Sequence, residues 1–262
     1  MKEKVNQNCN IDSANWQEWH QWLRQPSGNY IRAWEQNLLD TLTVDIFGFN
    51  AVQIGMPQMD CLAASRMPKK WLSNDTIIAN SPRKIALLHD FAELPFDSQS
   101  IDLVVLPHVL EFAREPHQVL REVERVLIPE GRLIICGFNA TSLWGARQAI
   151  GRMAGRYYLP RSGDFISLSR LKDWLKLLNM EVDRGHFGGY APPIDSEKWL
   201  QRFHFIEGVG ERWWPYMGAV YVVQAIKRVK GMHLIGPVWK QKKLRVPNAV
   251  PVTNRHHSER TD

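Results

Sequence analysis

The middle of the chain shows the clearest pattern of hydrophobic and polar positions. Residues 101–106 (IDLVVL) form a continuous apolar run, which is typical of a strand buried on both faces of a sheet. Residues 116–127 place apolar side chains on one helical face and charged side chains on the other. The sequence PEG at 129–131 ends that helix, and residues 132–136 (RLIIC) resume as a strand. This order predicts a βαβ unit, in which a right-handed crossover joins two parallel strands.

Weaker patterns on both sides extend this unit into a larger α/β domain. An N-terminal extension, residues 1–44, is expected to hold two helices that are separated by a turn at residues 26–29. A later helix is expected to begin at an N-cap, Ser167 or Ser169. The aromatic-rich residues 188–217 are expected to form an insertion. Short apolar runs predict further strands at 51–55, 76–79, 85–88, 180–187 and 218–226.

The strands expected at 76–79 and 85–88 follow each other unusually closely. Only turn-forming residues, Asn80, Ser81 and Pro82 among them, lie between them. A parallel crossover needs about a dozen or more residues. The two strands are therefore expected to pair as an antiparallel hairpin at one edge of the sheet, with no helix between them.

Charge is concentrated at the end of the chain. Residues 227–262 carry a net +7 against a total of +6, which leaves −1 for residues 1–226. The tail at 229–262 also contains three prolines, so it is expected to be disordered and to offer a binding segment for nucleic acid or another polyanion. A solubilising appendage is the alternative.

Other classes of protein are not indicated. No apolar stretch approaches the length of about 20 residues that a transmembrane helix needs. The N-terminus lacks the apolar segment of a secretory signal, so a cytoplasmic location is expected. The three cysteines, Cys9, Cys61 and Cys136, have neither disulfide-framework nor zinc-ligand spacing, so reduced thiols and no metal site are expected.

The sequence LHDFAELPF at 88–96, the leucine-rich helix after Pro116 and the run RVLIPEG at 125–131 together form a specific motif. In this motif, residues 88–139 resemble the class I, Rossmann-like S-adenosylmethionine-dependent methyltransferases of the type 11 branch. The resemblance extends over about 45–228 and implies a mostly parallel, seven-strand sheet. The matching positions are Asp90, Ala92, Leu94, Pro95, Phe96, Asp102, Pro116, Leu120, Glu122, Arg125, Val126, Leu127, Pro129 and Gly131.

The resemblance also implies a cofactor, S-adenosylmethionine, and residues that bind it. Asp90 matches the carboxylate that accepts a hydrogen bond from the adenine amino group, and Phe91 contributes the next backbone amide. Asp90 as a turn or N-cap carboxylate is the alternative. The remaining cofactor candidates lie after the expected strands, where ligands of doubly wound sheets bind; they are Gly55, Asn80, Pro107 and His108.

The first strand departs from the family pattern. The family has an acidic residue and three glycines there, whereas this chain has Gln53 and Gly55 alone. Two functions therefore stay open: a methyltransferase with an unidentified acceptor, and a non-catalytic methyltransferase-like scaffold that binds RNA or a protein. Methyl transfer mainly requires that donor and acceptor are held in line. The candidates for residues beside the acceptor are His108, Glu111, Asn139 and Tyr190.

Overall fold

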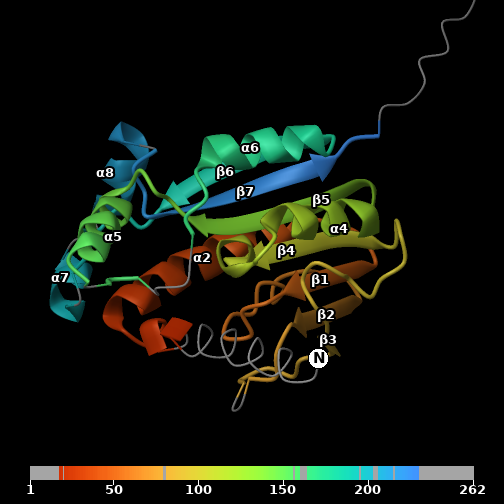
Figure 1. The fold of residues 1–262 in the computed structure, drawn as a ribbon, viewed down its shortest axis with the longest axis horizontal. Helices are drawn as coiled ribbons and strands as arrows, with labels where there is room; N and C mark the ends of the chain where they lie inside the picture. The colour runs from red at the N-terminus through yellow and green to blue at the C-terminus, as the bar shows by residue number, and fades with distance from the viewer. Residues whose placement is uncertain are drawn as a thin grey trace, which may run out of the picture. The chain divides into compact units, whose positions relative to one another are not determined.

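A seven-stranded sheet with the order β3-β2-β1-β4-β5-β7-β6 organises the described part of the chain (Figure 1). The computed structural model describes residues 18–19, 21–78, 81–155, 157–159, 164–194, 196–202, 206–214 and 216–229, all within one unit, Met1–Val229. The strands are β1 (Asn50–Ile54), β2 (Lys69–Asn74), β3 (Leu87–Leu88), β4 (Ile101–Pro107), β5 (Leu127–Phe138), β6 (Met180–Gly188) and β7 (Val220–Lys227). The helices are α2 (Pro26–Val44), α3 (Val109–Phe112), α4 (Pro116–Val126), α5 (Leu143–Met153), α6 (Leu168–Leu177), α7 (Glu197–Arg202) and α8 (Ile206–Trp213).

The sheet is parallel from β3 to β5 and antiparallel at β7. β1 pairs in parallel with β2 and β4, and β4 pairs in parallel with β5. β7 runs antiparallel to both β5 and β6. The βαβ unit predicted from residues 101–136 is present as β4, α4 and β5. The predicted fold class, a mostly parallel seven-strand sheet of the Rossmann-like methyltransferase type, is thus confirmed.

The predicted hairpin is wrong. The second strand is β2, a segment in which Lys69 and Lys70 are exposed and only the last three residues are buried. β3 pairs with β2 in parallel, with Ser73 opposite Leu87. The apolar run at 76–79, taken as a strand, is an irregular connection in its described part, and Ile77 is 79% exposed. The connection between β1 and β2 has no helix, and neither has the described part of the connection between β2 and β3.

The N-terminal helices differ little from the prediction. The described residues of the first one, 18–19 and 21–22, are helical. The turn predicted at residues 26–29 is wrong: these residues form the first turn of α2, which begins at Pro26 because proline is well accommodated there. The later helix, α6, begins after Ser167, whose side chain accepts a hydrogen bond from the amide of Arg170 and so acts as the N-cap.

Two residues of the sequence motif hold the segment that follows β3. The Arg125 guanidinium on α4 donates to the carbonyl oxygens of Leu94 and Phe96, each at 2.9 Å. Glu122 pairs with Arg125 at 2.8 Å and accepts from the amide of Leu94. This pair fixes residues 94–96 against α4. The preceding turn, which includes Asp90, therefore lies between two fixed segments, β3 and residues 94–96.

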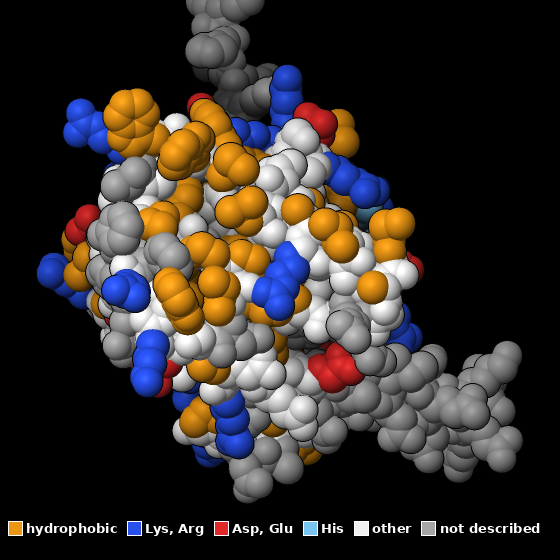
Figure 2. Space-filling model, turned by 90° about the vertical axis from the view of Figure 1, so that its left-hand side faces the viewer, with side chains coloured by type: hydrophobic (Ala, Val, Ile, Leu, Met, Phe, Trp, Pro, Cys, Tyr) orange, Lys and Arg blue, Asp and Glu red, His pale blue; other side chains and the backbone are white. Residues whose placement is uncertain are grey.

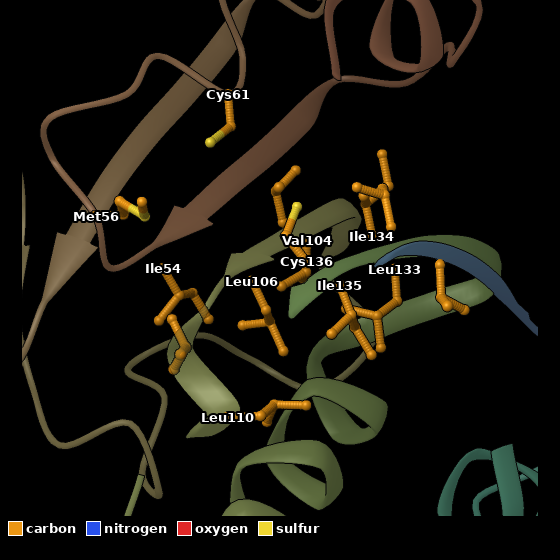
Figure 3. Packing of buried hydrophobic residues seen from close by; sticks show 14 of the residues in the cluster. Ile54, Met56, Cys61, Val104, Leu106, Leu110, Leu133, Ile134, Ile135 and Cys136 are labelled. Atoms are coloured by element: carbon orange, nitrogen blue, oxygen red, sulfur yellow. The ribbon is translucent and has the colours of Figure 1, made fainter. Parts of the chain in front are cut away.

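The hydrophobic core joins the central strands to the helices around them. Figure 3 shows part of it, with Ile54 of β1, Val104 and Leu106 of β4, and Ile134 of β5. The apolar run of β4 is buried as its sequence predicted. The carboxyl ends of β1, β2, β4 and β5 point to one side of the sheet, the left in Figure 1, where α5, α7 and α8 also lie. Two of these helices, α7 and α8, come from the segment predicted as an aromatic insertion.

Candidate functional site

A cavity of about 650 Å³ lies beside the carboxyl ends of β2 and β3. Asp75, the residue directly after β2, and Asp90, two residues after β3, both line it. Phe91, Phe112 and Val119 supply apolar surface. Two carboxylates beside apolar walls suit a ligand that carries hydroxyl or amino donors on a flat apolar body. The other lining residues are Thr76, Ala92, Glu93, Ala113, Arg114, Glu115 and Gln118.

Asp90 has a local role as well as a place at the cavity. Its Oδ1 atom accepts a hydrogen bond of 2.9 Å from the amide of Ala92, and its carbonyl oxygen accepts from the amide of Glu93. The carboxylate therefore stabilises the turn after β3, which is the alternative that the sequence left open. The side chain is exposed, and the turn presents it to the cavity together with the buried Phe91.

Asp75 was not identified from the sequence. The prediction assigned the position after the second strand to Asn80, because that strand was placed too late; Asn80 itself lies outside the described residues. Asp75 is half-buried, and its Oδ1 atom accepts from the Thr76 hydroxyl at 3.2 Å. The sequence did contain a signal for this position. Asp75 follows the short apolar pair Trp71-Leu72 and two polar residues, as a carboxylate at the end of a strand would.

The loop after β1 is held by Gln53 instead of by glycines. The fully buried Gln53 side chain donates to the carbonyl oxygens of Gly55, Met56 and Met59 at 3.0–3.1 Å and accepts from the amide of Cys61. Gly55 and Met56 adopt left-handed backbone angles, with φ of 76° and 50°. The Met56 side chain is completely buried beneath the loop. The substitution that the sequence marked as a departure thus has a structural role of its own.

Arg83 reinforces this loop from the connection between β2 and β3. Its guanidinium donates to Gln53 at 2.6 Å and to the carbonyl oxygen of Met59 at 2.9 Å, and it pairs with Asp60 at 2.9 Å. A cation bound to an amide, a carbonyl oxygen and a carboxylate is well positioned to fix two helix-free loops against each other. The edge of the sheet that lacks helices is therefore stabilised by a polar network.

His108, at the carboxyl end of β4, lies in a buried cluster with two carboxylates. Its Nε2 is 2.8 Å from Glu35 of α2, and its Nδ1 is 2.8 Å from Glu111 of α3. All three side chains are almost completely inaccessible to solvent. Burial opposes protonation of the imidazole, but the two carboxylates outweigh it and raise the pKa of His108 to about 10. His108 is thus an imidazolium at neutral pH, with both ring nitrogens acting as donors.

The second carboxylate of this cluster also binds the sheet. Glu111 accepts a short hydrogen bond of 2.5 Å from the amide of Phe138 at the end of β5. Burial raises the pKa of Glu111, and the nearby imidazolium opposes that rise. Because both ring nitrogens of His108 are engaged, neither offers a lone pair to a metal ion. Within the described ranges, no group of three or more His, Cys, Asp or Glu side chains could hold a metal.

The N-terminal segment closes over the cluster. The Trp19 ring lies 5.0 Å from the His108 ring and 5.6 Å from that of Phe138, measured between centroids. Trp22 stacks on Trp19 at 5.2 Å. The indole nitrogens of both tryptophans and the Oε2 atom of Glu35 are buried without a hydrogen-bond partner. Two of these orphaned atoms, on Trp19 and Glu35, belong to side chains that contact His108, and they mark a place where a polar ligand would gain hydrogen bonds.

The other candidates from the sequence have different surroundings. Asn139, after β5, donates to the carbonyl oxygens of Tyr216 and Gly218 and so connects β5 to the segment before β7. The backbone amide of Tyr190 donates to Glu207 of α8, and Tyr190 does not line the cavity. Pro107 is buried at the end of β4. The structure therefore brings His108 and Glu111 together. Asn139 and Tyr190 instead bind other segments, namely the one before β7 and helix α8.

Comparison with known proteins finds a matching family model and similar folds. Residues 67–135 match the family model described as "Methyltransferase domain", a range that runs from just before β2 into β5. Over these residues the chain is similar to a methyltransferase domain. Its fold is similar to that of a SAM-dependent methyltransferase from Thermotoga maritima, with a TM-score of 0.56 and 15% identity over 84% of this chain and 99% of that one. A SAM-dependent methyltransferase from Archaeoglobus fulgidus gives a TM-score of 0.54 and 15% identity over 75% and 94%.

A relative with higher sequence identity to this chain is the protein YafS of Escherichia coli (strain K12). The two are 31% identical over 163 residues, which are 62% of this chain and 65% of YafS. The chain thus spans somewhat less than two thirds of the length of this relative.

S-adenosylmethionine is the cofactor of the methyltransferase family, and one half of it fits the described residues. Asp75, Asp90 and Phe91 line one cavity and offer carboxylate acceptors beside an aromatic ring, the chemistry that ribose hydroxyls and an adenine amino group require. The cavity is not lined by Gly55, Met56 or His108. The cavity therefore fits the nucleoside half, and the loop after β1 does not line it.

Proposed function

We propose that this chain is an S-adenosylmethionine-dependent methyltransferase that holds the nucleoside between Asp75 and Asp90. The observation that supports this most is the convergence of these two carboxylates, from the ends of neighbouring strands, on one cavity. The bound cofactor supplies an electrophilic methyl group on a sulfonium. The chain binds and orients the cofactor and excludes water from it. Asp75 and Asp90 accept the nucleoside's hydrogen bonds, and Trp19 covers the end of β4.

The His108 cluster is proposed to shape the acceptor side of this site. An imidazolium between two carboxylates carries a net negative charge of one, which favours a cationic group nearby over an anionic one. The same cluster fixes α2 and α3 to the end of β4 through Glu35 and Glu111. The acceptor is proposed to enter between these elements, where the orphaned atoms of Trp19 and Glu35 lie.

Each cavity carboxylate is expected to contribute to cofactor affinity. Asp75→Ala and Asp90→Ala each remove a charged hydrogen-bond acceptor worth roughly 1.5–3 kcal/mol, which predicts about a 10- to 150-fold loss of affinity. Calorimetric titration with S-adenosylhomocysteine measures the loss. Asp173→Ala, which removes an exposed carboxylate on α6, is the matched control and should bind like the wild type. Affinity within twofold of the wild type in both cavity variants, with unchanged circular dichroism, would refute the assignment.

A non-catalytic, methyltransferase-like scaffold is the second candidate. It is favoured by the loop after β1, where one glycine remains, Met56 is buried and Gln53 and Arg83 hold the backbone. The two candidates differ in one observation. A scaffold would bind neither S-adenosylmethionine nor S-adenosylhomocysteine in the titration above, whereas the enzyme would bind both.

A cytoplasmic location and a tail that binds nucleic acid complete the proposal. Cys61 and Cys136 are buried free thiols, and burial raises the pKa of both, which suits a reducing compartment. In the residues that the structure describes, no helix has the length and apolarity to span a membrane. The basic tail lies outside these residues.

Deletion of residues 231–262 tests the tail. Because the excess positive charge of the chain lies beyond residue 226, the deletion is expected to abolish salt-dependent binding to RNA while the melting temperature stays nearly unchanged. Fluorescence anisotropy with a labelled single-stranded RNA at two salt concentrations measures the first effect. Equal RNA affinity of the truncated and complete chains would exclude the tail as the binding segment.

A further inference from the structure

Helix α5 exposes three apolar side chains and buries a polar one. Its outward side chains include Leu143, Ile150 and Met153, which are 54%, 69% and 91% exposed. The inward side holds Trp144 and the polar Gln148, both almost fully buried. A surface helix normally places its apolar stripe against the core and its polar residues outside. The outward stripe of α5 is therefore not explained by the packing of this domain.

Hydrogen bonds fix the orientation of α5 on the domain. The Trp144 indole donates to the carbonyl oxygen of Ala191 at 2.7 Å, and the Ser142 side chain caps the helix by accepting from the amide of Gly145. Gln148 donates to the carbonyl oxygen of Leu159 and accepts from its amide. With Trp144 and Gln148 held in this way, the helix cannot rotate to bury its outward stripe without losing these hydrogen bonds.

The residues next to α5 in the sequence carry charge of one sign. Residues 140–163 contain four arginines and neither aspartate nor glutamate. Two of the arginines, Arg147 and Arg152, are exposed on α5, and Arg147 lies over the Tyr158 ring at 4.0 Å. Arginine side chains can lay their apolar stems on a hydrophobic surface while the guanidinium reaches polar groups.

Aromatic side chains continue this surface on α7 and α8. Trp199 on α7, and Trp213, Trp214 and Tyr216 at the end of α8, are between 47% and 70% exposed. Figure 2 faces the side on which α5, α7 and α8 lie in Figure 1, and shows hydrophobic side chains gathered there, with Lys and Arg among them and along their rim. A large exposed apolar area of this kind marks an interaction site.

We propose that this surface, formed by the exposed side chains of α5, α7 and α8, docks on the interface of an anionic lipid bilayer. Three features together favour a bilayer over other occupants. Tryptophan and tyrosine are the side chains preferred at the level of lipid headgroups. Helix α5 presents an exposed aliphatic stripe for the acyl boundary. The exposed arginines of α5, Arg147 and Arg152, complement anionic headgroups. This inference does not depend on the proposed methyl transfer.

Vesicle binding by the complete chain tests the proposal. The probes are vesicles of phosphatidylglycerol and phosphatidylcholine in equal parts, and vesicles of phosphatidylcholine alone, separated by sedimentation. The wild type is expected to bind the anionic vesicles, and to bind them less at high salt. The triple variant Leu143→Ser, Ile150→Ser, Met153→Ser is expected to bind about tenfold less or worse. The double variant Arg147→Gln, Arg152→Gln is expected to lose the salt dependence in part.

A matched triple variant on other parts of the surface controls for general hydrophobicity. Phe47→Ser, Phe49→Ser, Leu177→Ser removes three side chains that are 73–81% exposed and lie outside α5, α7 and α8. This variant is expected to bind like the wild type, within about twofold. If the α5 triple variant fails to fold by circular dichroism, Met153→Ser alone, at the most exposed position, carries the test.

Several results would overturn the proposal. These are absence of binding to anionic vesicles, equal binding by the α5 variant and the wild type, and equal loss in the control variant. Binding of single-stranded RNA that the α5 variant loses, without vesicle binding, would assign the surface to nucleic acid instead. A wild-type dimer that the α5 variant dissociates, again without vesicle binding, would assign it to a second copy of the chain.

Discussion

Replacing Glu35 by alanine is expected to destabilise the fold by about 3–5 kcal/mol, because it leaves the buried imidazolium of His108 with one carboxylate instead of two. Glu35 lies on the inner face of α2, is fully buried, and has its Oε1 atom 2.8 Å from Nε2 of His108. Equilibrium unfolding in urea measures the change. Asn37→Ala, at an exposed position of the same helix, is the control and should change the free energy of unfolding by less than about 0.5 kcal/mol.

Glu35→Gln separates charge from hydrogen bonding. Its amide oxygen can still accept from Nε2 of His108. The free energy of unfolding of Glu35→Gln is therefore expected to lie between those of the wild type and Glu35→Ala. Equal stabilities of Glu35→Ala and Asn37→Ala would show that the contact between α2 and the end of β4 contributes nothing to the fold.

Stability is also expected to decrease as the pH rises above neutrality. The pKa of His108 is about 10 in the folded chain, against about 6.5 in an unfolded one. Between these values the folded state keeps a proton that the unfolded state has lost. The contribution is therefore complete below pH 6.5 and decreases by about 1 kcal/mol per pH unit until it is lost near pH 10.

Urea unfolding at pH 7 and pH 9 measures this slope. His108→Gln, which cannot be protonated, is expected to show a flatter dependence. Should that variant not fold, the nitrogen chemical shifts of His108 in the wild type at pH 8 give the same information, since they distinguish imidazolium from imidazole. A neutral His108 at pH 8 would contradict the charge assigned to the cluster.

The parts of the fold that could be predicted are those with strong hydrophobic periodicity. β4 is buried on both faces and reads as a continuous apolar run, and α4 separates its charged and apolar faces cleanly. β2 was missed because it begins with two exposed lysines and shows only Trp71 and Leu72 as an apolar signal. The exposed Ile77, by contrast, belongs to a loop although the sequence favoured a strand there.

The site was predicted in part, for a similar reason. Asp90 and His108 follow strands that the motif located correctly, whereas Asp75 follows the strand that was misplaced. Glu35 lies about 70 residues before His108, and no local pattern connects them. A signal did exist: Ile31, Glu35 and Leu39 share one stripe of α2, and a carboxylate on a buried stripe requires a partner.

The structure of the chain with bound S-adenosylhomocysteine tests the central claim most directly. The account predicts that the nucleoside occupies the cavity beside Phe91, with the carboxylates of Asp75 and Asp90 within hydrogen-bond distance of its ribose hydroxyls and its adenine amino group. A nucleoside bound elsewhere in the protein, or bound in this cavity with both carboxylates out of hydrogen-bond reach, would contradict it.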